Sequence, residues 1–201
     1  RRTRHLTRVL AVLVLLLGST GAWAQALTGT KAIPGDYATV ALAIADLNSK
    51  GVGAGGVTFN AIAGGSETFA SPTAGTITAT GTSANPIRFQ ISGTGTYTIT
   101  AGVGTSTTAD AIITLAASDY VTFNGFTLTD PTSNGAAASA MEYGFLLSRT
   151  GSGATLNGTN NNTIQNCVIT LQRAYAATGT PTGIFVSSGL AATPATALSA
   201  S

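Results

Sequence analysis

The sequence predicts an all-β fold, a parallel β-helix (solenoid) with a short N-terminal capping α-helix, and three observations favour it. The segment from Ser118 to Leu128 alternates apolar and polar residues, as a half-buried strand does. The alternation slips by one residue at Asn124-Gly125, a dipeptide that tolerates positive φ, so two short strands are expected to meet there at a corner. The pattern returns 41 residues later, with Ile164 in the place of Phe123. Because a strand-corner-strand unit buries its apolar side only by stacking on a copy of itself, the repeat predicts a solenoid.

Aligning the two copies predicts which side chains point inwards. Cys167 takes the place of Phe126, and Ile169 takes the place of Leu128. We therefore expect Phe123 to lie beside Ile164 and the following five residues to be buried: Phe123, Phe126, Ile164, Cys167 and Ile169. Cys167 is the only cysteine, so it forms no intramolecular disulfide, and its inward position indicates a small buried side chain rather than a nucleophile or metal ligand.

Composition favours a secreted β-protein of one domain. Only 8% of the 201 residues are charged, against about a quarter in an ordinary globular domain. Glycine, alanine, threonine, serine and asparagine take their place, while 44% of the residues are hydrophobic. That apolar content and its regular pattern argue against disorder.

Residues 1–24 have the three parts of a secretory signal peptide. Four arginines within the first eight residues precede the apolar run Val9 to Leu17, and a small-residue stretch ends in Ala22-Trp23-Ala24. The nine apolar residues are too few to cross a bilayer, which takes about 20. We therefore expect no membrane span after signal removal, and a secreted or cell-surface location.

Removal of residues 1–24 changes the charge and the chemistry of the chain. Five basic and seven acidic residues remain, a net charge of −2 without a basic cluster, which argues against nucleic acid as a partner. The only histidine, His5, leaves with the signal, so a Ser-His-Asp triad and the common zinc sites are excluded from the remainder. We expect no cofactor and no metal site.

Residues 25–56 are predicted to be a lead-in, Leu27 to Gly35, followed by a capping helix. Thr39 is a suitable N-cap, and Val40, Ile44 and Leu47 fall on one helical face. Such a short helix is stable only when docked, and its position before the first strand predicts a cap over the end of the solenoid. The glycine-rich stretch 51–56 lacks the motif of a phosphate-binding loop and is interpreted as a connector.

Residues 57–201 are predicted to form the N-terminal part of a parallel β-helix. Strands are expected around Val57, Ile77, Ile87, Tyr97, Ile112, Val121, Phe145, Ile164 and Ile184. A third corner copy would come next, but an Ala/Thr/Ser run leads to Ser201 instead. We therefore expect a piece of a longer protein, truncated at its C-terminal end, whose last coil is open and whose further coils are partners in the same chain.

Several segments support a family resemblance. The stretch from Gly35 to Ile44, with Gly56 to Asn60, is similar to the N-terminal start of pectin-lyase-like right-handed β-helix proteins. Four further segments resemble large secreted β-helix repeat proteins of Gram-negative bacteria: Thr78 to Gln90, Asp119 to Gly125, Met141 to Gly144, and Asn161 to Cys167. The resemblance implies a right-handed coil and extracellular export, often by a type IX system that reads a C-terminal sorting domain. It implies no single activity, because this fold carries lyases, hydrolases, esterases and adhesins.

Four acidic residues are the candidates for polysaccharide chemistry: Asp110, Asp119, Asp130 and Glu142. Asp119 and Asp130 stand at turns, where a carboxylate typically caps backbone N–H groups. No two acids stand at i, i+2 on one predicted strand, so no catalytic pair or calcium clamp is visible within a strand, although a pair across coils stays open. No catalytic, cofactor-binding or metal residue is therefore assigned.

Two other sets of side chains are candidates for binding. Asn124 and Asn166 are expected to hydrogen-bond along the stack rather than bind a ligand. Five tyrosines would form a sugar-stacking platform if several were exposed together. They are Tyr37, Tyr97, Tyr120, Tyr143 and Tyr175.

Two functions remain open. The first is a non-catalytic secreted or cell-surface protein for adhesion, or for binding a polysaccharide or cell-surface glycan, on a long face rich in threonine and asparagine. The second is the N-terminal fragment of a polysaccharide lyase or glycoside hydrolase with catalytic coils beyond residue 201.

Overall fold

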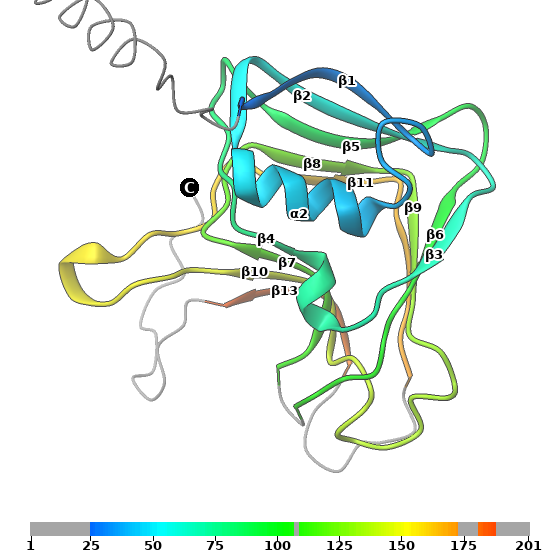
Figure 1. Cartoon of the computed structure of the whole chain (residues 1–201). Helices are drawn as coiled ribbons and strands as arrows, with labels where there is room; N and C mark the ends of the chain where they lie inside the picture. Colours follow the sequence, from blue (N-terminus) through cyan, green and yellow to red (C-terminus); the bar gives the residue numbers. More distant parts are fainter. Residues whose placement is uncertain (1–24, 107–108, 173–180, 188–201) are drawn as a thin grey trace, which may run out of the picture.

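Figure 1 shows a computed structural model of the chain, which describes residues 25–106, 109–172 and 181–187. The strands form three parallel sheets around a common core. Sheet A contains β1 (Leu27–Ile33), β2 (Val52–Ile62), β5 (Ile87–Ser92), β8 (Val121–Asn124) and β11 (Thr163–Gln165). Sheet B contains β3 (Ser66–Thr68), β6 (Tyr97–Thr100), β9 (Phe126–Thr129) and β12 (Val168–Thr170). Sheet C contains β4 (Thr76–Ile77), β7 (Ala111–Ala116), β10 (Tyr143–Ser148) and β13 (Thr182–Ser187).

From β2 onwards the chain passes through the sheets in the fixed order A, B, C, and repeats this order to β13. Each passage is called a coil below. Within the described residues one α-helix, α2 (Val40–Lys50), and two 3₁₀ turns, η1 (Pro72–Gly75) and η2 (Gly153–Thr155), complete the structure. Strand-rich parallel sheets with one helix agree with the fold class that the sequence predicts.

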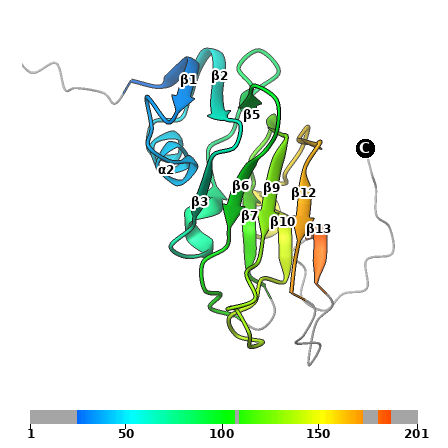
Figure 2. The same ribbon diagram turned by 90° about the vertical axis from the view of Figure 1, so that its right-hand side faces the viewer.

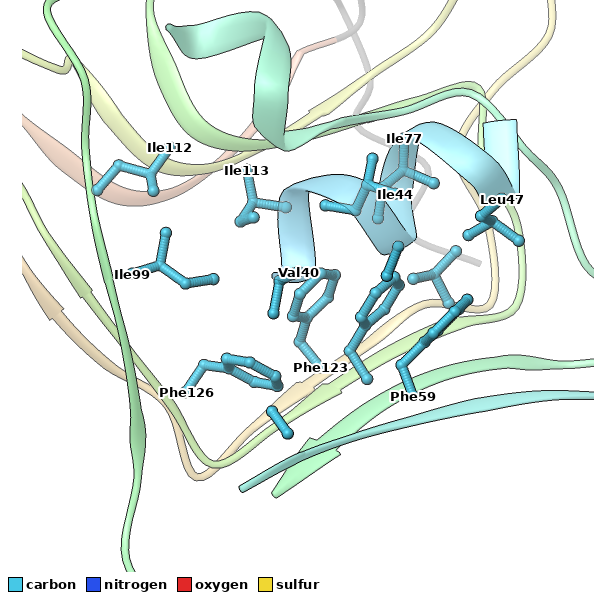
Figure 3. Packing of buried hydrophobic residues seen from close by; sticks show 14 of the residues in the cluster. Val40, Ile44, Leu47, Phe59, Ile77, Ile99, Ile112, Ile113, Phe123 and Phe126 are labelled. Carbon is cyan, nitrogen blue, oxygen red and sulfur yellow. The ribbon is translucent and has the colours of Figure 1, made fainter. Parts of the chain in front are cut away.

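The inward residues of successive coils stand in register. In sheet A, Phe59 pairs with Phe89, Phe89 with Phe123, and Phe123 with Ile164. The rings of Phe59 and Phe89 stack at 4.6 Å and those of Phe89 and Phe123 at 4.8 Å, so the aromatic column runs straight through three coils (Figure 3). The predicted contact between Phe123 and Ile164 is confirmed.

In sheet A the separation in sequence between stacked residues grows along the chain while the register is kept. Asn60 and Gln90, neighbours in sheet A, are 30 residues apart. Val121 and Asn162, which are hydrogen-bonded neighbours at the start of the last two strands of sheet A, are 41 residues apart. The strands do not lengthen, so the added residues lie in the loops between them.

The predicted corner lies where sheet A turns into sheet B. Gly125 has φ 88° and separates β8 from β9, and Asn166, its counterpart in the next coil, has φ 53°. A Cβ at Gly125 would come within 2.8 Å of the Ile91 side chain, so glycine is required by space as well as by backbone conformation.

The burial prediction holds for the first copy of the corner and fails for the second. Phe123 and Phe126 are fully buried. Ile164, Cys167 and Ile169 are only half-buried, although they pack against the core. Their strands, β11 and β12, are the last of sheets A and B, so these side chains are covered by a neighbouring coil on one side alone.

Helix α2 forms as the sequence predicts and covers the first coil (Figures 1 and 3). Thr39 is the N-cap, and its Oγ1 accepts a hydrogen bond from the Leu42 N–H at 3.2 Å. The apolar face, Val40, Ile44 and Leu47, is fully buried. Asn48, on the same helix, donates to the Thr76 carbonyl at 2.7 Å and accepts from the Thr78 N–H at 2.9 Å, which satisfies backbone groups at the edge of sheet C.

Residues 25–56 contain two strand segments that the sequence did not predict. The lead-in forms strand β1, and the stretch interpreted as a connector becomes a strand at Val52, where β2 begins. Strands β1 and β2 pair in parallel, Leu27 with Val52 and Gly29 with Val57, across an irregularity in the register. Ladder hydrogen bonds between backbone groups need no side chain, so the glycine-rich sequence was a poor guide there.

The far end of the stack is open within the described residues. Strands β11, β12 and β13 have no further partner strand there, and Ile184 and Val186 are 47% and 65% exposed. No helix in the described ranges is long and apolar enough to cross a membrane. The predicted signal peptide (1–24), Tyr175 and most of the residues from Thr178 to Ser201 lie outside the described residues.

We expect Phe123→Ala to lower the free energy of unfolding by about 3–5 kcal/mol, because it opens a cavity in the middle of the aromatic column. Thr122→Ala, on the outward face of the same strand, is the control and should change stability by less than about 0.5 kcal/mol. Urea unfolding followed by circular dichroism measures both. Equal effects of the two substitutions would contradict the assignment of the core.

We expect the chain to self-associate through the open end, because β13 presents an unpaired parallel edge beside exposed apolar side chains. Replacing both Ile184 and Val186 by lysine should suppress this association in sedimentation velocity. The control is Val103→Lys, which changes another exposed apolar residue and should leave the self-association unchanged. A monodisperse monomer, with amides near Ile184 as protected from hydrogen exchange as those near Phe123, would disprove an open end.

Candidate functional site

Three of the four candidate acids come together across coils, between sheets B and C. Asp110 precedes β7, Asp130 follows β9 and Glu142 precedes β10. The Asp110 N–H donates to Glu142 Oε2 at 2.7 Å, and the charges of Asp110 and Asp130 both act on Glu142. This grouping is the pair across coils that the spacing within single strands left open.

The carboxylates of this acidic cluster (Asp110, Asp130 and Glu142) are bound by the protein itself. Asp130 is 1% exposed and accepts hydrogen bonds from the Met141 N–H at 3.0 Å and from the Asn134 amide at 2.7 Å. Asp110 accepts from the N–H groups of Thr105 and Ser106, the latter at 2.6 Å. These contacts hold the long loop between β9 and β10 against the preceding coil.

Burial is the main influence on the protonation of the cluster. It raises the pKa of Asp130 and of Glu142 above the ordinary carboxyl range, against the hydrogen bonds that favour their charged forms. The neighbouring negative charges of Asp110 and Asp130 add to the rise for Glu142. Within the described residues no three side chains of the metal-binding types are placed to hold a metal ion. The arrangement therefore acts as a brace between coils.

Asp119 has the turn role that the sequence predicts. Its Oδ1 accepts a hydrogen bond from the Asn160 N–H at 2.6 Å, and its own N–H donates to Thr80 Oγ1 at 3.1 Å. The side chain thus joins its own coil to the next one at the start of sheet A.

The four described tyrosines do not form one platform. Tyr37 lies edge-on to Phe59 and donates to Asp46 at 2.7 Å, while Tyr97 is buried. Tyr120 has φ 54° at the turn before β8, and Tyr143 stacks on Phe185 at 4.7 Å in sheet C. The described tyrosines are thus distributed over different parts of the molecule.

Cys167 is held in place by its thiol. The Sγ donates to the Gln165 carbonyl at 3.3 Å, and burial raises the pKa of the thiol. A half-buried thiol with a raised pKa is a weak nucleophile, in agreement with the packing role expected from the sequence.

Glu67 has a role that the sequence analysis missed. It lies on β3, and its two carboxylate oxygens accept hydrogen bonds from the first helical N–H groups, Val40 at 2.8 Å and Ala41 at 3.2 Å. The Tyr97 side chain also hydrogen-bonds to Glu67, and burial together with this carboxylate raises the pKa of Tyr97 to about 12. Burial raises the pKa of Glu67 as well, so desolvation outweighs the favourable helix terminus.

The outward face of sheet A carries a row of amide side chains. Asn60, Gln90, Asn124 and Gln165 stand in register on successive strands. Gln90 Nε2 donates to Asn60 Oδ1 at 2.9 Å, and Asn166 Nδ2 donates to Asn124 Oδ1 at 2.8 Å. The expected hydrogen bonds of asparagine along the stack are confirmed, so much of this row satisfies itself.

Arg88 lies beside this row and differs from it. Its side chain is exposed on β5, at the centre of the sheet, between Thr58 and Thr122 of the neighbouring strands. Within the described residues no carboxylate or carbonyl binds its guanidinium. Arg88 and the amide row form the candidate site: an outward strand surface with an exposed guanidinium, free of protein partners among the described residues, and several amide groups.

A polar hollow of about 240 Å³ lies beside β1 and includes Lys31 and Lys50. Lys50 is already paired with Asp46 at 2.8 Å. The hydrogen bonds from Lys50 and then Tyr37 are the main reasons why the pKa of Asp46 is lowered. This hollow joins the end of the helix to β1, and we assign it no ligand.

No family model, curated protein or solved structure matches the chain. The geometry of the outward faces is therefore the basis for function.

We expect the contribution of Glu67 to the free energy of unfolding to depend on pH. Because its pKa is raised in the folded state, its contribution is full below the ordinary carboxyl range, near pH 4, and is lost as pH rises through the raised value. Glu67→Gln cannot ionise, and its amide satisfies the two N–H groups less well. The wild type should therefore have the higher melting temperature in acid, with a difference that narrows towards neutral pH.

The control is Asp36→Asn, which removes an exposed carboxylate that also accepts a backbone N–H, from Ala32 at 2.7 Å. Melting temperatures between about pH 4 and pH 8 measure all three proteins. A difference between wild type and Glu67→Gln that widens with pH would mean that the ionised carboxylate is the stabilising form.

Proposed function

We propose that the chain is part of a right-handed parallel β-helix of the pectin-lyase-like type, which presents an outward face for binding a polysaccharide or cell-surface glycan without catalysis. The repeated order of sheets A, B and C supports the fold, and crossovers between parallel strands are right-handed in about 98% of cases. The signal-like residues 1–24 and the low charge support secretion or display on a bacterial surface, with export of the type IX kind.

The observation that carries the binding proposal is the exposed guanidinium of Arg88 without a partner in the described chain. A guanidinium binds carboxylate and sulfate groups through two parallel hydrogen bonds, and it stacks on flat surfaces. The neighbouring amides of Asn60, Gln90 and Asn124 provide the donors and acceptors that sugar hydroxyls need. An acidic glycan chain laid across the strands of sheet A fits these groups.

A binding role without turnover agrees with the state of the acids. The described carboxylates of the acidic cluster accept backbone or amide hydrogen bonds from their own chain. A general acid or base needs an open path to the bond that it protonates or deprotonates. The cluster lies between sheets B and C, away from the face that carries Arg88.

We expect Arg88→Ala to reduce binding to acidic polysaccharides, such as a polyuronate, about tenfold or more, because a charge-assisted pair contributes about 1.5–3 kcal/mol. Arg149→Ala, which removes the same charge from the loop after β10, is the control and should bind as the wild type does. Immobilised glycans and calorimetry measure both variants.

Equal binding by Arg88→Ala and the wild type would remove Arg88 from the site. Turnover of any polysaccharide that is abolished by changing Asp110, Asp119, Asp130 or Glu142 would overturn the non-catalytic proposal in favour of a lyase or hydrolase.

A further inference from the structure

The outward face of sheet B carries two straight rows of side chains, all of which except Val168 bear a hydroxyl. Strands β3, β6, β9 and β12 pair in register without a shift, so outward residues line up from coil to coil. The array is defined by its members, one row being Ser66, Thr98, Thr127 and Val168, and the other Thr68, Thr100, Thr129 and Thr170. Figure 2 looks onto this sheet from outside, with its strands side by side.

The hydroxyls of this array differ from the amides of sheet A in having no protein partner. Among the described residues, no hydrogen bond engages the side chains of the central threonines, Thr98, Thr100, Thr127 and Thr129. The face also carries no charge, because Glu67, the ionisable residue of β3, turns towards helix α2. What remains is a repeating pattern of hydroxyl and methyl groups in contact with solvent.

The two spacings of the array are fixed by the backbone. Adjacent strands lie about 4.8 Å apart, and residues i and i+2 on one strand lie about 6.6 Å apart. Hydrogen-bonded water oxygens lie about 2.75 Å apart. In a tetrahedral ice lattice with this bond length, two oxygens that are bonded to the same third oxygen lie about 4.5 Å apart. The lattice repeats every two puckered layers, a distance of about 7.3 Å.

The mismatch between array and lattice is small enough to be taken up by the side chains. Along a row, the strand spacing of about 4.8 Å exceeds the lattice distance of about 4.5 Å by about 0.3 Å, which adds up to about 0.9 Å over the three intervals between four strands. Between the two rows, the spacing of about 6.6 Å is about 0.7 Å shorter than the lattice repeat of about 7.3 Å. Rotation about χ1 moves a threonine hydroxyl by more than this. Val168 keeps the shape of threonine and Ser66 keeps its hydroxyl, so the end members preserve the pattern.

We propose that this threonine array binds the surface of crystalline ice. The near match of the two sheet spacings, the missing charge and the hydroxyls without a protein partner together favour an ordered water lattice as the ligand. A glycan site would need stacking aromatic rings or converging polar groups, which this face lacks among the described residues. The proposal concerns a different sheet from the Arg88 site and does not depend on glycan binding there.

The test is adsorption of the purified chain to ice, measured by partition into a growing ice hemisphere and by thermal hysteresis of a single crystal. We expect the wild type to concentrate in ice and to hold crystal growth below the melting point. Thr127→Tyr and Thr100→Tyr, in different strands of the array, should each abolish both effects, because a protruding ring separates the face from a flat lattice.

The matched control is Thr114→Tyr, an outward threonine at the centre of sheet C, which should keep full activity. Circular dichroism and thermal melting must show the three variants folded as the wild type is. A folded wild type that ice excludes would overturn the proposal. An equal loss of ice adsorption in all three variants would also overturn it. The same holds if the wild type binds crystalline cellulose and not ice, and Thr127→Tyr removes the binding to cellulose. Loss of glycan binding in Arg88→Ala with ice adsorption intact would separate this face from the Arg88 site.

Discussion

The stacking of Phe59, Phe89 and Phe123 is the interaction on which the rest of the structure depends. Each ring is fully buried only because the coil on either side supplies a ring, helix or aliphatic side chain. A shift of one residue in any strand would turn its aromatic side chain into solvent. The core therefore fixes the register of sheet A, and through the corner at Gly125 it fixes that of sheet B as well. The regularity of both outward faces is a result of inward packing.

The two ends of the stack are covered in different ways. At the first coil, β1 pairs with β2, Asn48 binds the backbone of sheet C, and Glu67 binds the first turn of α2. At the other end, the described part of the chain offers no equivalent, and Ile164, Cys167 and Ile169 are covered on one side only. Burial therefore decreases from the helix-covered end to the end at β11, β12 and β13.

The sequence predicted well those features of the structure that depend on a periodic pattern of residues. The corner at Asn124-Gly125, its copy at Gln165-Asn166 and the helix with its Thr39 cap depend on local spacing, which a single sequence contains. Strand β1, the role of Glu67 and the acidic cluster depend on which residues face each other across coils. Asp110 and Glu142 are 32 residues apart, a separation that follows from loop lengths and not from any periodicity. The unpaired Arg88 likewise emerges only when its neighbours in the sheet are known.

The growing separation of stacked residues in sheet A, from 30 to 41, has a consequence for how such a chain diversifies. Residues inserted in the loops between strands leave every stacked side chain opposite its partner, so a loop can lengthen without disturbing the core. The loop between β9 and β10 shows how an insertion becomes anchored to the preceding coil: the Asn134 amide donates to the Gly102 carbonyl, and the Glu142 carboxylate accepts from the Asp110 N–H. New chemistry can thus be added at the loops while the flat faces stay constant, which makes the loops the natural positions for grafting recognition sequences.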